Sequence, residues 1–276
     1  MKPVSFEYNT PASLSLTTDL LVRTKKDAKL ISGGQSLGPM LNLRLARPEL
    51  LIDISKLSEL KEIGEDKSKV IIGASITHST IEDGGVVEPI SGMLRYVASR
   101  IAYRAVRNKG TIGGSLAHAD PAADWVTTMM ALSAVIKTRT SDGIIRKIPM
   151  HDFMLGAYRT ALKHDEIISS IEIPKYSKKA CWGYHKICRK VGEFANAIGA
   201  IVVDPVQKYC IIACGAVGGA PLILQDLSES VARSAAVPDI LEIVLALETS
   251  EQQFDAVKMQ QLAVSVQRAI EKAVCK

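Results

Sequence analysis

The sequence predicts an α+β protein with two N-terminal α/β units and a C-terminal antiparallel sheet on which helices pack. Two observations predict the α/β units. Each unit contains short apolar runs, and each unit carries a glycine-rich loop between an apolar run and a helix-like stretch. The third observation is a change of pattern near residue 177, after which three strand candidates precede two amphipathic stretches. We place the three units at residues 1–56, 57–176 and 177–276.

The first unit begins with a strand candidate near residues 6–8 and a helix expected over residues 13–25. The apolar run 28–31 then leads into the first glycine-rich loop, and residues 37–46 have apolar side chains at the spacing of a buried helix. Residues 50–54 complete the unit as a strand. The loop consists of Ser32, Gly33, Gly34, Gln35, Ser36 and Leu37.

The second unit begins with strands near residues 61–63 and 70–74, joined by a charged turn, and continues with a helix over residues 93–100. The second glycine-rich loop consists of Gly110, Thr111, Ile112, Gly113, Gly114 and Ser115. Asp120 and Pro121 after it have the residue types of an N-cap and a first helical residue, which predicts a helix to about residue 134. Strands near residues 134–139 and 167–173 and a polar linker over residues 174–179 follow.

The C-terminal unit has strand candidates at residues 183–186, 197–203 and 209–214, with Asp204 and Pro205 as a turn between the second and third. Helices are expected over residues 239–247 and 259–274. The last helix carries apolar side chains every four residues on one stripe, which predicts that this stripe packs on the sheet.

The two loops together predict a site for a phosphate-containing cofactor. Paired glycines permit left-handed backbone angles and let bare amides approach a pyrophosphate, and a helix start adds unsatisfied N–H groups. Neither loop matches the G-x-G-x-x-G fingerprint or a P-loop, and either one alone could be a tight turn. Arg104, Arg107 and Lys109, just upstream of the second loop, form a solvated face or attract an anionic cofactor.

Composition is that of an ordinary globular chain, with 276 residues, 47% hydrophobic and 23% charged. The sequence has no apolar run near the ~18 residues of a membrane span and no signal-peptide core, so we expect a cytoplasmic protein. The net charge of +5 is scattered, which argues against nucleic-acid binding. Five cysteines lack zinc or iron–sulfur spacing, and we expect reduced, mostly buried thiols.

Residues 32–55 and 105–134 resemble the two FAD-binding segments of the medium, flavin-carrying subunit of the molybdenum hydroxylases, the family of xanthine and carbon monoxide dehydrogenases. The stretch 184–195 is similar to the start of that family's C-terminal domain. The resemblance implies an oxidoreductase subunit with noncovalent FAD that passes electrons from two [2Fe–2S] clusters of a small subunit to an external acceptor. A large molybdenum–pterin subunit would hydroxylate a heteroaromatic or aldehyde-type substrate, within a dimer of heterotrimers.

The resemblance also implies a role for each matching residue. Ser32–Leu37 would bind the pyrophosphate, while Thr111, Gly113, Gly114 and Ser115 would approach it and the ribityl chain. Asp124 would hold the adenosine ribose, and Ala102 and Ile168 would line the adenine or the isoalloxazine. Lys186 would lie near the polar edge of the flavin, where a cation favours the anionic reduced form. Phe194 would stack on the isoalloxazine or simply pack, and His118 would line the loop as a hydrogen-bond donor.

No side chain of the sequence is assigned a catalytic or metal-binding role, and His78, His151, His164 and His185 are expected to be structural or surface residues. Two other functions remain open. One is a self-contained FAD oxidase of the vanillyl-alcohol type, with covalent flavin and its own substrate, for which 276 residues leave little room. The other is a regulatory or assembly protein with the same fold and an empty site. The organic substrate and the electron acceptor are not determined by this sequence.

Overall fold

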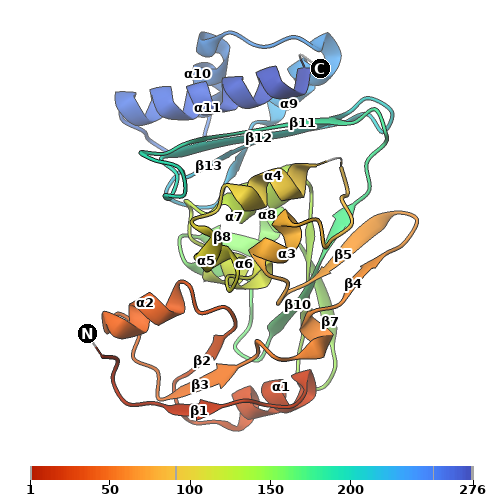
Figure 1. Ribbon diagram of the computed structural model, residues 1–276. Coiled ribbons are helices and arrows are strands. Elements are labelled where there is room, and N and C mark those ends of the chain that lie inside the picture. Colours follow the sequence, from red (N-terminus) through yellow and green to blue (C-terminus); the bar gives the residue numbers. More distant parts are fainter. Residues whose placement is uncertain (1, 91, 251, 275–276) are drawn as a thin grey trace.

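The computed structural model describes residues 2–90, 92–250 and 252–274. Figure 1 shows three layers: a small N-terminal sheet, a central unit of helices and antiparallel strands, and a C-terminal sheet covered by helices on its outer face. The predicted α+β class is confirmed by this arrangement. The limits of the three units stay a prediction.

The first unit is a parallel sheet with the strand order β1-β3-β2. Its helix α1 starts where Ser13 accepts a hydrogen bond from the backbone of Leu16 at 3.2 Å, a typical N-cap. The elements are β1 (Glu7–Asn9), α1 (Leu14–Arg23), β2 (Ala28–Ile31), α2 (Leu37–Asn42) and β3 (Leu50–Asp53).

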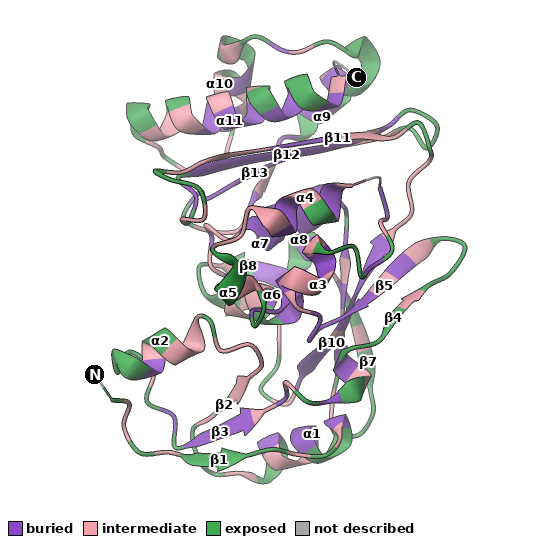
Figure 2. Ribbon diagram, in the orientation of Figure 1, coloured by how far each residue is buried: buried purple, intermediate pink, exposed green. Residues whose placement is uncertain are grey.

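The expected buried helix over residues 37–46 is wrong in length and in burial. Helix α2 ends at Asn42, because Arg44 takes a left-handed conformation with φ of 59° and turns the chain. Leu41 is buried, whereas Leu43 and Leu45 are exposed, Leu45 by 72%. Figure 2 shows α2 mainly in the colours of exposed and half-buried residues.

The central unit has a sheet with the order β4-β5-β10-β6-β7, in which every pairing is antiparallel. The predicted strands and the helix at Met93–Ser99 are confirmed, while several short elements were not predicted. The elements are η1 (Ser58–Leu60), β4 (Ile63–Glu65), β5 (Lys69–Gly73), α3 (His78–Glu82), α4 (Met93–Ser99), α5 (Arg104–Arg107), α6 (Ile112–His118), α7 (Asp124–Ala131), β6 (Val135–Arg139), β7 (Ile145–Pro149), α8 (Met150–Phe153), β8 (Met154–Gly156), β9 (Arg159–Thr160) and β10 (Ile167–Pro174).

The expected helix start at Asp120 is also wrong. The second glycine-rich loop itself forms the first turn of α6, and Ala119 ends that helix with φ of 51°. Asp120 then makes a turn in which its carboxylate accepts from the Ala122 N–H at 2.9 Å. The next helix, α7, begins after Ala123 and is buried along its whole length, with Trp125 in the core.

The C-terminal unit is an antiparallel sheet with the order β11-β12-β13-β14, as predicted for its first three strands. Helix α11 lies across its outer face, and α4 and α7 lie beneath its inner face (Figure 1). Close approach of α11 requires Gly199, where an added Cβ would lie 2.3 Å from the carbonyl oxygen of Ser265. The elements are β11 (Cys181–Ile187), β12 (Ala197–Asp204), β13 (Tyr209–Gly215), β14 (Leu222–Ile223), α9 (Gln225–Ser234), α10 (Ile240–Glu248) and α11 (Ala256–Val274).

The segment expected as a polar linker is held by side-chain hydrogen bonds. The Tyr176 hydroxyl donates to the Leu132 carbonyl at 2.9 Å, and the Ser177 hydroxyl donates to Asp204 at 2.7 Å. These contacts anchor the segment to the central unit through Tyr176 and to the C-terminal sheet through Ser177. Across the described residues, no helix has both the length and the apolar character needed to cross a bilayer.

The described cysteines are free thiols, but burial differs from the expectation. Cys214 is buried, whereas Cys181, Cys188 and Cys210 are half-buried, and Cys275 lies outside the described residues. Burial raises the pKa of Cys210 to about 11 and that of Cys214 to about 12, so both stay protonated near neutral pH.

Candidate functional site

The two glycine-rich loops come from different units and touch each other. A Cβ added to Gly33 would lie 1.9 Å from the carbonyl oxygen of Lys109, so the backbones are in direct contact there. The Thr111 hydroxyl donates to the Ser32 hydroxyl at 3.4 Å, and Ser32 is also 3.2 Å from the hydroxyl oxygen of Ser75. The pairing of the loops, expected from their glycines, is therefore present in the fold.

The first loop has the geometry of an anion-binding turn. Gly34 has φ of 68°, a conformation that favours glycine. Within the described residues, the backbone N–H groups of residues 33–36 donate to no protein acceptor. Gln35 turns back to donate to the Gly33 carbonyl at 2.9 Å, and Ser36 precedes α2 without capping it. The loop can thus offer several N–H donors to a phosphate group, which fits the pyrophosphate of FAD.

The second loop differs, because its N–H groups are used inside the protein. Thr111 caps α6 by accepting from the Gly114 N–H at 3.1 Å, and the Gly113 N–H donates to the Ala74 carbonyl at 2.9 Å. Gly113 is buried for packing, since an added Cβ would lie 2.5 Å from the Cβ of Ala74. Its glycine requirement is therefore steric. Gly114 and Ser115 keep exposed surface, and their contact with a cofactor stays a prediction.

The arginines upstream of the second loop are paired with acids, so they are not a free cationic patch. Arg107 makes two bonds to Glu82, at 2.7 and 2.9 Å, and lowers the pKa of that carboxyl group. Arg104 binds both Glu82 and Asp83. Arg107 also donates to the carbonyl of Ala102 at 3.0 Å and so holds this residue in its left-handed turn, with φ of 41°.

Asp124 and Lys186 form a buried ion pair between the central unit and the C-terminal sheet. The Lys186 ammonium lies 2.8 Å from Asp124 Oδ1, and the Tyr184 hydroxyl donates to the same oxygen at 2.5 Å. Asp124 is 6% exposed and Tyr184 is 1% exposed. Burial raises the pKa of Asp124, and the Lys186 charge opposes this rise. Sequence analysis selected Asp124 and Lys186 separately and missed Tyr184, whose alternation with Lys186 on one strand face was the available signal.

The remaining predicted residues differ in exposure and in surroundings. Phe194 is 65% exposed, and the neighbouring Gly192 lies against Ala102, where an added Cβ would be 2.9 Å from the Ala102 carbonyl oxygen. Ile168 is buried in β10. The His118 ring lies 5.2 Å from the Tyr158 ring, measured between centroids. Their contacts with a flavin stay predictions.

His78 is a structural residue, as expected. It is buried beneath the second loop, and its Nδ1 accepts a hydrogen bond from the Trp125 indole at 3.0 Å. Burial lowers the pKa of His78 to about 4, with a further contribution from the Arg107 charge, so the ring is neutral near pH 7.

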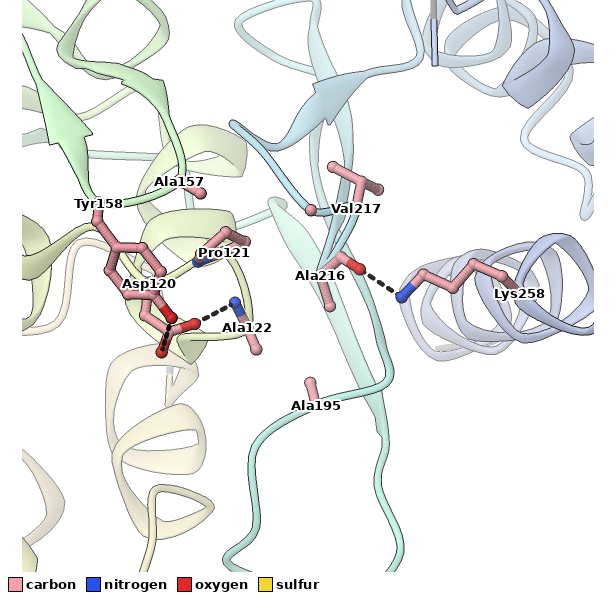
Figure 3. A pocket seen from close by; sticks show the side chains of 10 residues that line it. Asp120, Pro121, Ala122, Ala157, Tyr158, Ala195, Ala216, Val217 and Lys258 are labelled. Carbon is pink, nitrogen blue, oxygen red and sulfur yellow. Dashed lines mark hydrogen bonds between the residues drawn. The ribbon is translucent and has the colours of Figure 1, made fainter. Parts of the chain in front are cut away.

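An open cavity of ≈ 460 Å³ is lined in part by the turn at residues 120–122 and was not predicted. Figure 3 shows Asp120 and Tyr158 on one side of it and Lys258 on the other. The Lys258 ammonium donates to the carbonyls of Asn196 and Ala216, which ties this cation to the backbone.

Comparison with known proteins agrees with this geometry. Residues 4–176 match the family described as the FAD binding domain in molybdopterin dehydrogenase. The chain is 38% identical over 203 residues to the carbon monoxide dehydrogenase medium chain of Hydrogenophaga pseudoflava, covering 74% of this chain and 70% of that protein. It is 34% identical over 256 residues to the nicotine 6-hydroxylase medium subunit of Paenarthrobacter nicotinovorans, covering 93% and 86%.

The fold matches solved structures along the whole chain. Quinoline 2-oxidoreductase from Pseudomonas putida 86 superposes with a TM-score of 0.89 at 32% identity, covering 100% of this chain and 99% of that one. Carbon monoxide dehydrogenase from Hydrogenophaga pseudoflava gives the same values. The family match covers more than half of the chain, two relatives are more than 30% identical to it, and the solved structures cover its whole length. The chain belongs to the FAD-binding medium subunits of the molybdopterin hydroxylases and is the oxidoreductase flavin subunit of such a complex.

Proposed function

We propose that this chain binds one FAD noncovalently and carries electrons from the iron–sulfur clusters of a partner subunit to an external acceptor. The observation that carries the proposal is the contact between two glycine-rich loops of different units, with free N–H donors in the first. Bound FAD supplies reversible one- and two-electron transfer. The residues of this chain bind, orient and electrostatically tune it.

The geometry refines two of the residue roles implied by the resemblance. Asp124 Oδ1 and the Lys186 ammonium are 2.8 Å apart. One extended FAD cannot place its adenosine ribose on Asp124 and its flavin edge on Lys186, because these groups lie at opposite ends of the cofactor. We retain Lys186 at the flavin edge and assign Asp124 as its counter-ion. Ser32–Leu37, Gly114 and Ser115 then serve the pyrophosphate, Ala102, Ile168 and Phe194 line the rings, and His118 lines the loop as a hydrogen-bond donor.

The proposed partners follow from the relatives that this chain resembles. Both the carbon monoxide dehydrogenase and the nicotine 6-hydroxylase relatives are medium chains, a term that implies a larger and a smaller companion. We propose a large molybdenum–pterin subunit and a small subunit with two [2Fe–2S] clusters, assembled as a dimer of heterotrimers. Relatives named for nicotine, quinoline and glyceraldehyde favour a heteroaromatic or aldehyde-type substrate for the complex.

The cofactor proposal is tested by purifying the chain with its co-expressed partners and denaturing the complex. We expect one equivalent of FAD per chain in the supernatant. Covalently retained flavin would favour the vanillyl-alcohol type of oxidase, and an absence of flavin would favour a regulatory protein. Release of FMN in place of FAD would contradict the two-loop pyrophosphate site.

The electron route is tested with a Gly34→Val variant of the assembled complex. A branched side chain at φ of 68° is strained, so this variant should lose FAD. Substrate should still reduce the clusters in one turnover, while steady-state turnover with the acceptor is lost. Rapid-mixing absorbance at the cluster bands measures this. Loss of cluster reduction in an assembled, metal-loaded complex would show that this chain takes part in substrate oxidation.

A further inference from the structure

We infer that Tyr184 is a positioning residue that holds the Lys186 ammonium, through Asp124, at the edge of the flavin. The inference rests on the proposed function, because it takes FAD as the group that Lys186 faces. It goes beyond that proposal by giving a buried tyrosine a measurable role in flavin binding and flavin potential.

Tyr184, Asp124 and Lys186 form one connected network. Asp124 Oδ1 accepts from the Tyr184 hydroxyl at 2.5 Å and lies 2.8 Å from the Lys186 ammonium, which also donates to the Arg100 carbonyl at 2.9 Å. Tyr184 and Lys186 are two residues apart on β11 and therefore share one face of the strand. The carboxylate at the start of α7 thus receives two donors from the same strand.

The network is buried, so each contact has a large electrostatic effect. The Lys186 side chain is 6% exposed, similar to Asp124. A carboxylate in such surroundings stays ionised only when donors compensate its desolvation. Burial and Asp124 raise the pKa of Tyr184, so its hydroxyl keeps its proton and remains a donor. Loss of this donor raises the pKa of Asp124 further and weakens the counter-ion that holds the Lys186 ammonium in place.

Tyr184 is itself held rigidly. The Tyr96 ring meets it edge-on at a centroid distance of 6.2 Å, and the Lys272 ammonium donates to its backbone carbonyl at 2.9 Å. Helices α4, α7 and α11 therefore all contribute to fixing this residue. The Lys186 side chain has several rotatable bonds, so a residue that positions it must itself be rigid. Tyr184 meets this requirement.

The test compares Tyr184→Phe with Tyr209→Phe in the assembled complex. Tyr209 is a matched control because its hydroxyl also ties the C-terminal sheet to α7, donating to the Ala131 carbonyl at 2.6 Å at the other end of that helix. We expect Tyr184→Phe to weaken FAD binding about tenfold, the effect of about 1.4 kcal/mol, and to lower the flavin midpoint potential. Tyr209→Phe should change neither. Fluorescence titration and spectroelectrochemistry measure the two quantities.

A double variant tests whether Tyr184 acts through Lys186. If it does, Tyr184→Phe combined with Lys186→Met should have the potential and the FAD affinity of Lys186→Met alone. Additive effects, or equal effects of the two tyrosine variants, would overturn the inference. If Tyr184→Phe fails to fold, Asp124→Asn serves instead. This variant keeps an acceptor for the Tyr184 hydroxyl and removes the counter-ion of Lys186. An unchanged flavin potential in Asp124→Asn would overturn the inference. A wild-type complex without FAD would refute the proposed function itself.

Discussion

Gly33 and Gly38 lie five residues apart, but a methyl group should have opposite consequences at the two positions. At Gly33 it would overlap the Lys109 carbonyl, whereas at Gly38 it would meet open space. We expect Gly33→Ala to destabilise the protein by about 1–3 kcal/mol through overpacking and to lower its FAD content. Gly38→Ala in helix α2 should be neutral or stabilising by up to about 1 kcal/mol. Urea unfolding measures the stability of the two variants, and flavin absorbance measures their FAD content. Equal stability and equal FAD content of the two variants would show that the loops can move apart at Gly33 without loss of free energy.

His78 should make the protein less stable in mild acid. Its pKa is about 4 in the folded protein and ~6.5 in an unfolded chain, so the unfolded state binds more protons between these values. His78 therefore leaves the free energy of unfolding undiminished above pH 6.5. As the pH decreases toward 4, protonation of His78 in the unfolded chain lowers this free energy by about 3 kcal/mol in total. Thermal unfolding at pH 7.5 and pH 4.5 should show a smaller pH effect in His78→Gln, which keeps an acceptor for Trp125. An identical pH effect in both proteins would contradict this assignment.

At the level of single residues, sequence analysis found side chains whose local pattern carries information and missed those defined by distant partners. Gly34 was predictable because paired glycines after a strand indicate a left-handed turn, and its φ confirms it. Tyr184 was not selected although it alternates with Lys186 on β11, because its partner Asp124 lies 60 residues away in the sequence. Gly113 was selected as a cofactor contact, which stays a prediction, and the sequence did not show that glycine is also required there to make room for Ala74.

Among the elements, helix α6 links the two loops through its N-cap. Thr111 accepts from Gly114 and donates to Ser32. We expect Thr111→Val to cost about 1 kcal/mol, the usual value of a lost cap, and to weaken FAD binding. The matched control is Thr127→Val in α7, because the buried Thr127 hydroxyl has no hydrogen-bond partner among the described residues. That replacement should not destabilise the protein. Chemical denaturation compares the two, and an equal loss would contradict the capping role.

Element limits followed from the sequence where a local signal was present. Ser13 caps α1 and Asp239 caps α10, and both helices were predicted close to their observed limits. The helices around residue 120 were misplaced because an Asp-Pro pair has the residue types of a helix start and also of a turn. Tertiary packing decided between them: Ala119 ends α6 in a left-handed conformation, and the buried α7 begins at Asp124.

For the molecule as a whole, FAD held by loops of two units should act as a stabilising link between them. Free FAD at one hundred times its dissociation constant would add about 2.7 kcal/mol of stability, which raises the melting temperature by several degrees. FMN at the same concentration should have a much smaller effect, because it lacks the adenosine phosphate. Thermal shift assays of the flavin-depleted chain measure this. Equal stabilisation by the two flavins would contradict binding of the pyrophosphate by both loops.

The architecture was predictable only in part. The three units and their order followed from changes in hydrophobic pattern, because these reflect local chain geometry. Strand order did not, since β5 pairs with β10 across about one hundred residues and no local signal specifies such a pairing. The cofactor and the family followed from the resemblance, which the family match over residues 4–176 confirms.

The place of β10 has a consequence for how the protein is made. This strand lies at the centre of the order β4-β5-β10-β6-β7 and is its last member in sequence. During synthesis at about 5–20 residues per second, β5 therefore stays unpaired with β10 for roughly 5–20 s. Strand β6 stays unpaired with β10 for a shorter time. Both strands expose unpaired edges on the ribosome throughout this interval. The nascent chain is thus exposed to aggregation through these two edges until residue 174 emerges, which makes this a stage at which a chaperone would be of benefit.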